Sequence, residues 1–142
     1  MKKSQNYIDF MKNKLKILGV IPARLAASRF PNKPLKKITN LTMLEHVYER
    51  AKLSKTLDYL TIATCDKDIY NFSKKRNYNV IMTSNKHVRA LDRVYEASKK
   101  LSKKFKLKSK DLTICIQADE PMLDPKMIDK SIIFLKKNNN AK

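Results

Sequence analysis

Four short apolar segments alternate with segments of helical periodicity along this chain, and that alternation restricts the possible folds more than any other feature. The apolar segments, which we expect to be buried strands, are residues 15–21, 58–64, 79–83 and 112–117. In the segments between and after them, apolar residues recur every three or four positions, as on one face of a helix. Strands that alternate with helices form βαβ units, in which the strands run parallel and the helices cover the sheet. The sequence therefore predicts an α/β fold with a doubly wound, mostly parallel sheet.

The expected helices begin at residues that commonly cap helix N-termini. Thr42 and Glu45 have the spacing of a capping box, while Asp66 and the Asp124-Pro125 pair suit the starts of two later helices. The inward face of the third expected helix comprises Leu91, Val94, Tyr95, Ser98 and Leu101. We expect the strand order 3-2-1-4, which puts the first and fourth strands on either side of the topological switch point. Ligands of such sheets bind there, beyond the carboxyl ends of the strands.

The formal net charge of +19 has two possible meanings. A strongly basic surface can bind nucleic acid through phosphate contacts, or it can be a solvated lysine surface with no such partner. Only six of the 32 basic residues are arginines, and the lysines are spread over the expected helix faces and over residues 99–110. They do not gather into a recognisable DNA-reading motif. The distribution favours the solvated surface, and we do not expect a nucleic-acid partner.

The apolar segments are too short to span a bilayer, and residues 1–10 lack the apolar core of a secretory signal, so no membrane association is expected. Cys65 and Cys115 lie in expected strands, as small buried residues do, which favours a reduced, cytoplasmic setting. Residues 1–13 are expected to be a disordered N-terminal extension, with Met1 or Met11 as the true start.

The first apolar segment leads into a strongly basic loop. Within ten residues this loop carries four polar side chains suited to phosphate, namely Arg24, Ser28, Arg29 and Lys33. Arginine offers paired donors to phosphate oxygens and lysine a mobile point charge. The alternative is an ordinary solvated loop beside a proline-rich turn. Because Gly19 is the only glycine, the chain contains neither a Walker motif nor a Gly-x-Gly-x-x-Gly motif, which excludes P-loop nucleotide sites and standard NAD sites.

A second motif, Gln117-Ala118-Asp119-Glu120-Pro121, follows the fourth expected strand. A carboxylate such as that of Asp119 can hold Mg²⁺, which takes few protein ligands and relies on substrate phosphates for the rest. The Gln117 amide can donate and accept, as recognition of a base edge requires. The alternative is a turn with exposed acids. Because the two motifs follow the strands at the switch point, they should face one another, and the pair points to nucleotidyl transfer.

A third group, His87, Arg89, Asp92 and Arg93, forms a possible active-site loop. The competing interpretation is that Asp92 and Arg93 pair with each other on a helix. His46 is expected at the surface, and no serine, histidine and acid have a spacing that suggests a nucleophilic triad.

Residues 21–35 and 117–121 resemble the two signature motifs of the acidic-sugar cytidylyltransferases, above all the 3-deoxy-manno-octulosonate cytidylyltransferases (CMP-Kdo synthetases). The resemblance implies a Rossmann-like sheet of the nucleotide-diphospho-sugar-transferase type. It also implies Mg²⁺ held by Asp119, and CTP and an acidic sugar as substrates, with the product feeding lipopolysaccharide biosynthesis. The implied nucleotide-binding residues are Pro22, Ala23, Arg24, Ser28, Lys33 and Gln117, and the implied catalytic residues are Arg29 and Lys33. The anomeric hydroxyl of the sugar would attack the α-phosphorus of CTP and displace pyrophosphate.

The chain departs from the family pattern in three places and in length. Asn32 and Ala118 replace glycines, and Arg89-Ala90-Leu91 replaces Ser-Gly-Thr, so the resemblance implies the reaction class but not the identity of the sugar. Asn32 is a mild change because asparagine tolerates left-handed backbone. Family members are about twice as long, so residues 14–142 are expected to be the nucleotide-binding half of a truncated domain with weak binding and no efficient turnover alone. A homodimer or a separate chain could supply the missing half. Two alternatives stay open: a nucleotidyltransferase for another sugar or base, and a non-catalytic remnant that binds nucleotide or a partner.

Overall fold

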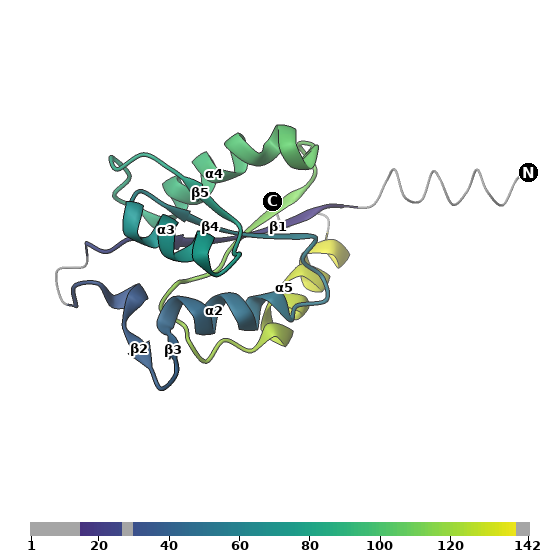
Figure 1. Cartoon of the computed structure of the whole chain (residues 1–142). Coiled ribbons are helices and arrows are strands. Elements are labelled where there is room, and N and C mark those ends of the chain that lie inside the picture. The colour runs from purple at the N-terminus through teal and green to yellow at the C-terminus, as the bar shows by residue number, and fades with distance from the viewer. Residues whose placement is uncertain (1–14, 27–29, 139–142) are drawn as a thin grey trace, which may run out of the picture.

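The computed structural model describes residues 15–26 and 30–138, and a parallel sheet forms its centre (Figure 1). The strands are β1 (Ile17–Ala23), β4 (Tyr59–Thr64), β5 (Val80–Met82) and β6 (Leu112–Cys115), in the order β5-β4-β1-β6. In chain order this is 3-2-1-4, so the predicted strand order is confirmed. The expected extension, residues 1–13 with both candidate starts, lies outside the described residues.

Strand β1 is central, and its composition follows from that position. All seven of its residues are buried, because β4 and β6 flank it and helices cover both faces. Gly19 is required by close packing: a Cβ added there would lie 3.0 Å from Leu57 Cδ1 and 3.1 Å from Cδ1 of both Leu60 and Ile116. The strand thus carries its following loop to the middle of the sheet's carboxyl edge.

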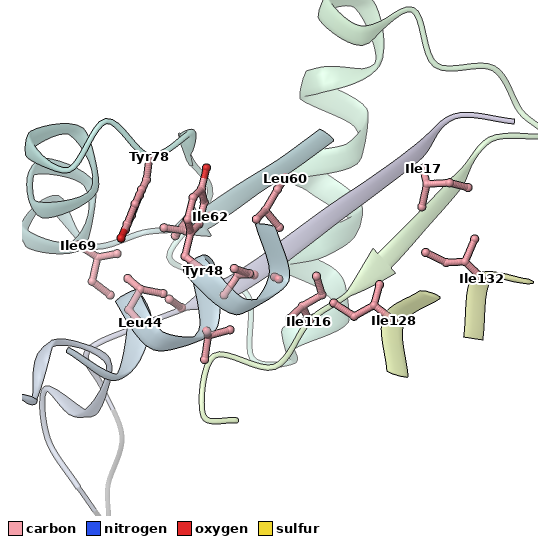
Figure 2. Close-up of a cluster of buried hydrophobic side chains, with 14 residues drawn as sticks. Ile17, Leu44, Tyr48, Leu60, Ile62, Ile69, Tyr78, Ile116, Ile128 and Ile132 are labelled. Carbon is pink, nitrogen blue, oxygen red and sulfur yellow. The ribbon is translucent and has the colours of Figure 1, made fainter. Parts of the chain in front are cut away.

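Helices cover the two faces of the sheet. The helices α2 (Met43–Lys52), α3 (Lys67–Lys75) and α5 (Pro125–Lys137) contribute side chains to one core cluster, and α4 (Ala90–Phe105) packs on the opposite face (Figure 1). Figure 2 shows the larger cluster, in which Leu44 and Tyr48 of α2 and Ile128 of α5 meet the sheet. The predicted doubly wound architecture is confirmed.

Two of the three predicted caps form. The Thr42 hydroxyl accepts from Glu45 N (3.2 Å) and the Glu45 carboxylate accepts from Thr42 N (2.7 Å), while Asp124 accepts from Lys126 N (2.9 Å). Asp66 occupies the N-cap position of α3, but its side chain makes no cap hydrogen bond. Its carboxylate instead accepts from Leu25 N at 2.8 Å, so the predicted cap interaction is wrong.

The predicted inward face of α4 is partly wrong. Val94 and Leu101 pack with Ala97 against β1 and β4, but Leu91 and Tyr95 are 66% and 65% exposed. Arg93 is buried in their place, with 3% exposure. The buried face of α4 therefore includes polar side chains that contact the segment after β5, as described below.

Three short elements between β1 and α2 were not predicted. They are the 3-10 helix η1 (Lys33–Leu35) and a hairpin of β2 (Lys37–Ile38) and β3 (Leu41–Thr42). Asn32, just before η1, has a left-handed backbone (φ 59°), which confirms the expected tolerance of asparagine at this position.

Both cysteine thiols are free. None of the helices in the described ranges has the length and apolar character needed to cross a membrane.

Candidate functional site

The basic loop and the Asp119 motif line one cavity at the carboxyl edge of the sheet. The cavity has a volume of about 280 Å³ and is lined by Pro22, Ala23, Arg24, Lys33, Pro34, Gln117, Ala118 and Asp119. Across it, Lys33 Nζ lies 3.1 Å from Asp119 Oδ2. The expectation that the two motifs face one another is therefore confirmed, whereas their roles toward a ligand stay predictions.

Hydrogen bonds link the two ends of the basic loop to each other and to Asp66, which follows β4. Leu25 donates its N–H to Asp66 Oδ2 (2.8 Å), and its carbonyl accepts from Asn32 N (3.2 Å). Pro34 is buried in η1, directly after Lys33. These contacts bring Arg24 and Lys33, nine positions apart in sequence, to the same cavity. The other two predicted loop residues, Ser28 and Arg29, lie outside the described residues.

The segment after β6 is held by backbone pairing up to the cavity. Ile116 N donates to Val20 O (2.9 Å), which continues the alignment of β6 with β1 for one more residue. Gln117 and Asp119 then project from an exposed turn, and the Asp119 side chain is 54% exposed. Because Lys33 is 33% exposed, their ion pair is solvent-screened and easily exchanged for contacts with a ligand.

A second, smaller cavity adjoins the first along the end of β1. It measures about 120 Å³ and is lined by Pro22, Ala23, Arg24, His87, Val88, Arg89, Ala90 and Arg93. Residues 22–24 line both cavities, so the predicted third group meets the basic loop there. Asp92 is exposed and lines neither of these two cavities.

The contacts of Arg93 show that it is anchored inside the protein. Its guanidinium donates to the Thr83 hydroxyl, to Ser84 O (3.3 Å) and towards Cys65 Sγ (3.4 Å). It does not form the Asp92 pair considered above. His46 lies elsewhere, with its Nε2 2.9 Å from Ile38 O of the hairpin.

Glu96 is a residue of this region that the sequence analysis missed. Its carboxylate contacts Lys100 Nζ (2.6 Å), Ser84 N (2.9 Å) and the His87 ring. The hydrogen bonds from Lys100, Ser84 and His87 outweigh the effect of burial and lower the pKa of Glu96 to about 2. A usable signal was present in the sequence, since Arg93, Glu96 and Lys100 recur at helical spacing on one face of α4.

A family model described as "Cytidylyltransferase" matches residues 18–142. The chain is 41% identical to the 3-deoxy-manno-octulosonate cytidylyltransferase of Thermodesulfovibrio yellowstonii, over 86% of this chain and 48% of that relative. It is also 41% identical to the 8-amino-3,8-dideoxy-manno-octulosonate cytidylyltransferase of Shewanella sp. (strain W3-18-1), over 83% of this chain and 46% of that protein. The chain thus spans about half the length of the curated relatives it matches.

Solved structures agree with the sequence matches. A CMP:2-keto-3-deoxy-manno-octonic acid synthetase solved in complex with CTP superimposes with a TM-score of 0.79 and 32% identity, covering 88% of this chain and 49% of the other. The α/β architecture and the sheet order match the nucleotide-diphospho-sugar-transferase fold. With the family match extending over residues 18–142, this chain belongs to the cytidylyltransferase family.

Proposed function

We propose that this chain is the nucleotide-binding half of a CMP-sugar synthetase, which transfers CMP from CTP to an acidic sugar of the 3-deoxy-octulosonate class and releases pyrophosphate. The observation that carries the proposal is the cavity in which Arg24 and Lys33 of one motif face Gln117 and Asp119 of the other. Cationic donors opposite a carboxylate and an amide are what a metal-bound nucleoside triphosphate requires.

In this proposal Arg24 and Lys33 bind the triphosphate, together with Ser28 and Arg29 of the same loop. The Gln117 amide takes part in recognition of cytosine, and Pro22 and Ala23 form the wall beneath the nucleotide. Lys33 also acts in catalysis, with Arg29, because both cations can neutralise the charge that accumulates on the leaving pyrophosphate.

The donor set at the cavity fits one Mg²⁺ ion held by Asp119 and by phosphate oxygens. The Asp119 carboxylate is accessible from the cavity, and its present partner is a screened lysine. Mg²⁺ needs one or two protein carboxylates when the substrate supplies the remaining oxygens. When bound, Mg²⁺ supplies charge neutralisation on the triphosphate. Within the described residues no group of three or more metal-ligating side chains exists, which fits a site completed by the substrate.

The proposed transfer is a single displacement at phosphorus. The anomeric hydroxyl oxygen of the sugar forms a bond to the α-phosphorus of CTP and gives up its proton to solvent. The bond from the α-phosphorus to the bridging oxygen breaks, and pyrophosphate leaves with the electron pair. Since no covalent enzyme intermediate is needed, the contribution of the chain is positioning and electrostatic stabilisation.

The proposal names a class of sugar rather than one sugar. The chain is equally identical, at 41%, to relatives named for 3-deoxy-manno-octulosonate and for its 8-amino-3,8-dideoxy counterpart. Arg89, at the wall of the smaller cavity, adds a cation that suits an acidic substrate. Because the chain spans about half of these relatives, we expect turnover to require the region that supplies the other half, in the same polypeptide, a second copy or a separate chain.

Calorimetric titration of the chain with CTP, UTP, ATP and GTP, with and without Mg²⁺, tests the proposal. The expected result is magnesium-dependent binding with a preference for CTP. Lys33→Ala should weaken that binding, whereas the matched control Lys37→Ala should not, because Lys37 is exposed in β2 and does not line the cavity. If the folded chain binds none of the four nucleotides, the proposal is wrong. If it binds CTP but supports no transfer even with the missing half present, the chain is a binding module.

A further inference from the structure

We infer that Glu96 is a positioning residue, which clamps the segment between β5 and α4 and thereby fixes the wall of the site formed by residues 87–89. The consequence for a ligand rests on the proposed function, whereas the clamp itself is independent of it.

Glu96 contacts three separate groups, and two of them belong to the clamped segment. One carboxylate oxygen accepts from Ser84 N (2.9 Å) and contacts His87 Nε2, and the other pairs with Lys100 Nζ (2.6 Å). The same ammonium group donates to Met82 O at 3.0 Å. Glu96 is 21% exposed and His87 is 23% exposed, so their contact is shielded more than an ordinary surface ion pair, whereas Lys100 is 49% exposed.

A second anchor on α4 holds the same segment one turn earlier. Arg93, 3% exposed, donates to the Thr83 hydroxyl and to Ser84 O. Positions 93, 96 and 100 occupy successive turns of α4, and together they contact the segment from Met82 to His87. Glu96 supplies the carboxylate of this set and accepts the hydrogen bond of the Ser84 backbone.

The clamp matters because residues 87–89 have little other packing. Val88 is 80% exposed and Arg89 is also exposed, yet both line the smaller cavity beside residues 22–24. Since few buried apolar contacts hold these residues, their position depends on the polar contacts just before them. A loosened wall would have to be ordered when a ligand binds, which weakens affinity.

The test compares Glu96→Gln with the parent by amide hydrogen exchange and by titration with Mg²⁺–CTP. Glutamine keeps the size of the side chain but removes the negative charge that strengthens its contacts with Lys100, His87 and the Ser84 amide. We expect the Ser84 amide to exchange about tenfold faster while β1 amides stay protected, and the Kd for CTP to rise about three- to tenfold. Asp68→Asn is the matched control, because it removes one carboxylate at an exposed position of α3 and should change neither value.

The outcomes separate the clamp from the proposed function. If the parent binds no CTP but Ser84 exchange accelerates in Glu96→Gln, the clamp stands and the proposed function fails. If Ser84 exchange and CTP affinity both stay at parent values, the clamp is wrong. If the β1 amides of Glu96→Gln also exchange faster, that variant is destabilised as a whole. Lys100→Met is then the second variant, because it removes only one exposed partner of Glu96. Unchanged Ser84 exchange in that variant also overturns the inference.

Discussion

Lys33 and Asp119 neutralise each other across the larger cavity, with Nζ and Oδ2 3.1 Å apart. In the proposed complex each has another partner, since the lysine binds phosphate and the carboxylate binds Mg²⁺. The free protein therefore has to break this pair before it binds the metal nucleotide. Because both side chains are partly exposed, breaking the pair costs free energy of the order of 1 kcal/mol or less.

The first prediction follows from that exchange of partners. Asp119→Asn releases Lys33, so this variant should bind metal-free CTP up to about fivefold more tightly than the parent does. Added Mg²⁺ should no longer improve CTP binding to the variant. Calorimetry with and without the ion measures both effects. Glu120→Gln, which removes the neighbouring exposed carboxylate, is the control and should retain magnesium dependence. If Asp119→Asn binds Mg²⁺–CTP as well as the parent does, the metal assignment is wrong.

The second prediction concerns Gly19, where three side chains lie within 3.1 Å of the site of a Cβ. Gly19→Ala should destabilise the protein by about 1–3 kcal/mol, because all three contacts belong to a packed core. Urea unfolding measures the change. Leu57 supplies the nearest atom, so Leu57→Ala should cost less in the Gly19→Ala background than in the parent. If the losses in unfolding free energy of Gly19→Ala and Leu57→Ala simply add, atoms other than those of Leu57 move to accommodate the new methyl group.

At the scale of elements, α5 is held to the loop after α2 through one carboxylate. Asp129 accepts from the Ser54 and Thr56 hydroxyls (2.6 and 2.7 Å) and from Thr56 N (3.1 Å). Burial acts to raise the pKa of Asp129, but the hydrogen bonds from Ser54, Thr56 and Lys55 together lower it below its ordinary value.

The third prediction is the pH dependence of that contact. A depressed folded-state pKa stabilises the protein above the unfolded aspartate pKa, about 3.9, and this stabilisation is lost as the pH falls through the folded value. The urea midpoint of Asp129→Asn should therefore lie below that of the parent at pH 6, and the gap should narrow below about pH 4. An equal gap at pH 6 and pH 3.5 would contradict the role of the charge.

The elements differ in how far the sequence predicts them. The four strands are predictable because buried parallel strands are apolar throughout, whereas their order was assumed from the usual doubly wound sheet. The inward face of α4 is predicted only in part, because side-chain contacts that apolar periodicity does not encode also contribute to it. Arg93 and Glu96 contact the segment after β5, whereas Leu91 and Tyr95 are exposed. Asp66 stands at the start of α3 as predicted, but its side chain forms no cap because its carboxylate accepts from Leu25 N, 41 positions away.

At the scale of the whole molecule, the cavity was predicted better than its surroundings. The meeting of the two motifs required only the strand order and the rule for switch points. The hairpin between β1 and α2 and the smaller cavity depend on local backbone geometry and on α4, so motif spacing alone did not reveal them.

The last prediction concerns the net charge of +19 over the 142 residues of this chain. Most of these charges are exposed lysines, and their mutual repulsion opposes the compact state. Salt shortens the screening length from about 30 Å at 0.01 M to about 8 Å at 0.15 M, so the Tm should rise by several degrees over that range. Calorimetric or circular-dichroism melts measure it. Lys103→Glu with Lys108→Glu lowers the net charge at exposed positions that do not line either cavity, and it should reduce the rise. A Tm that falls with salt would mean that attractive ion pairs outweigh the repulsion, and that the lysine surface is organised around acidic partners rather than solvated.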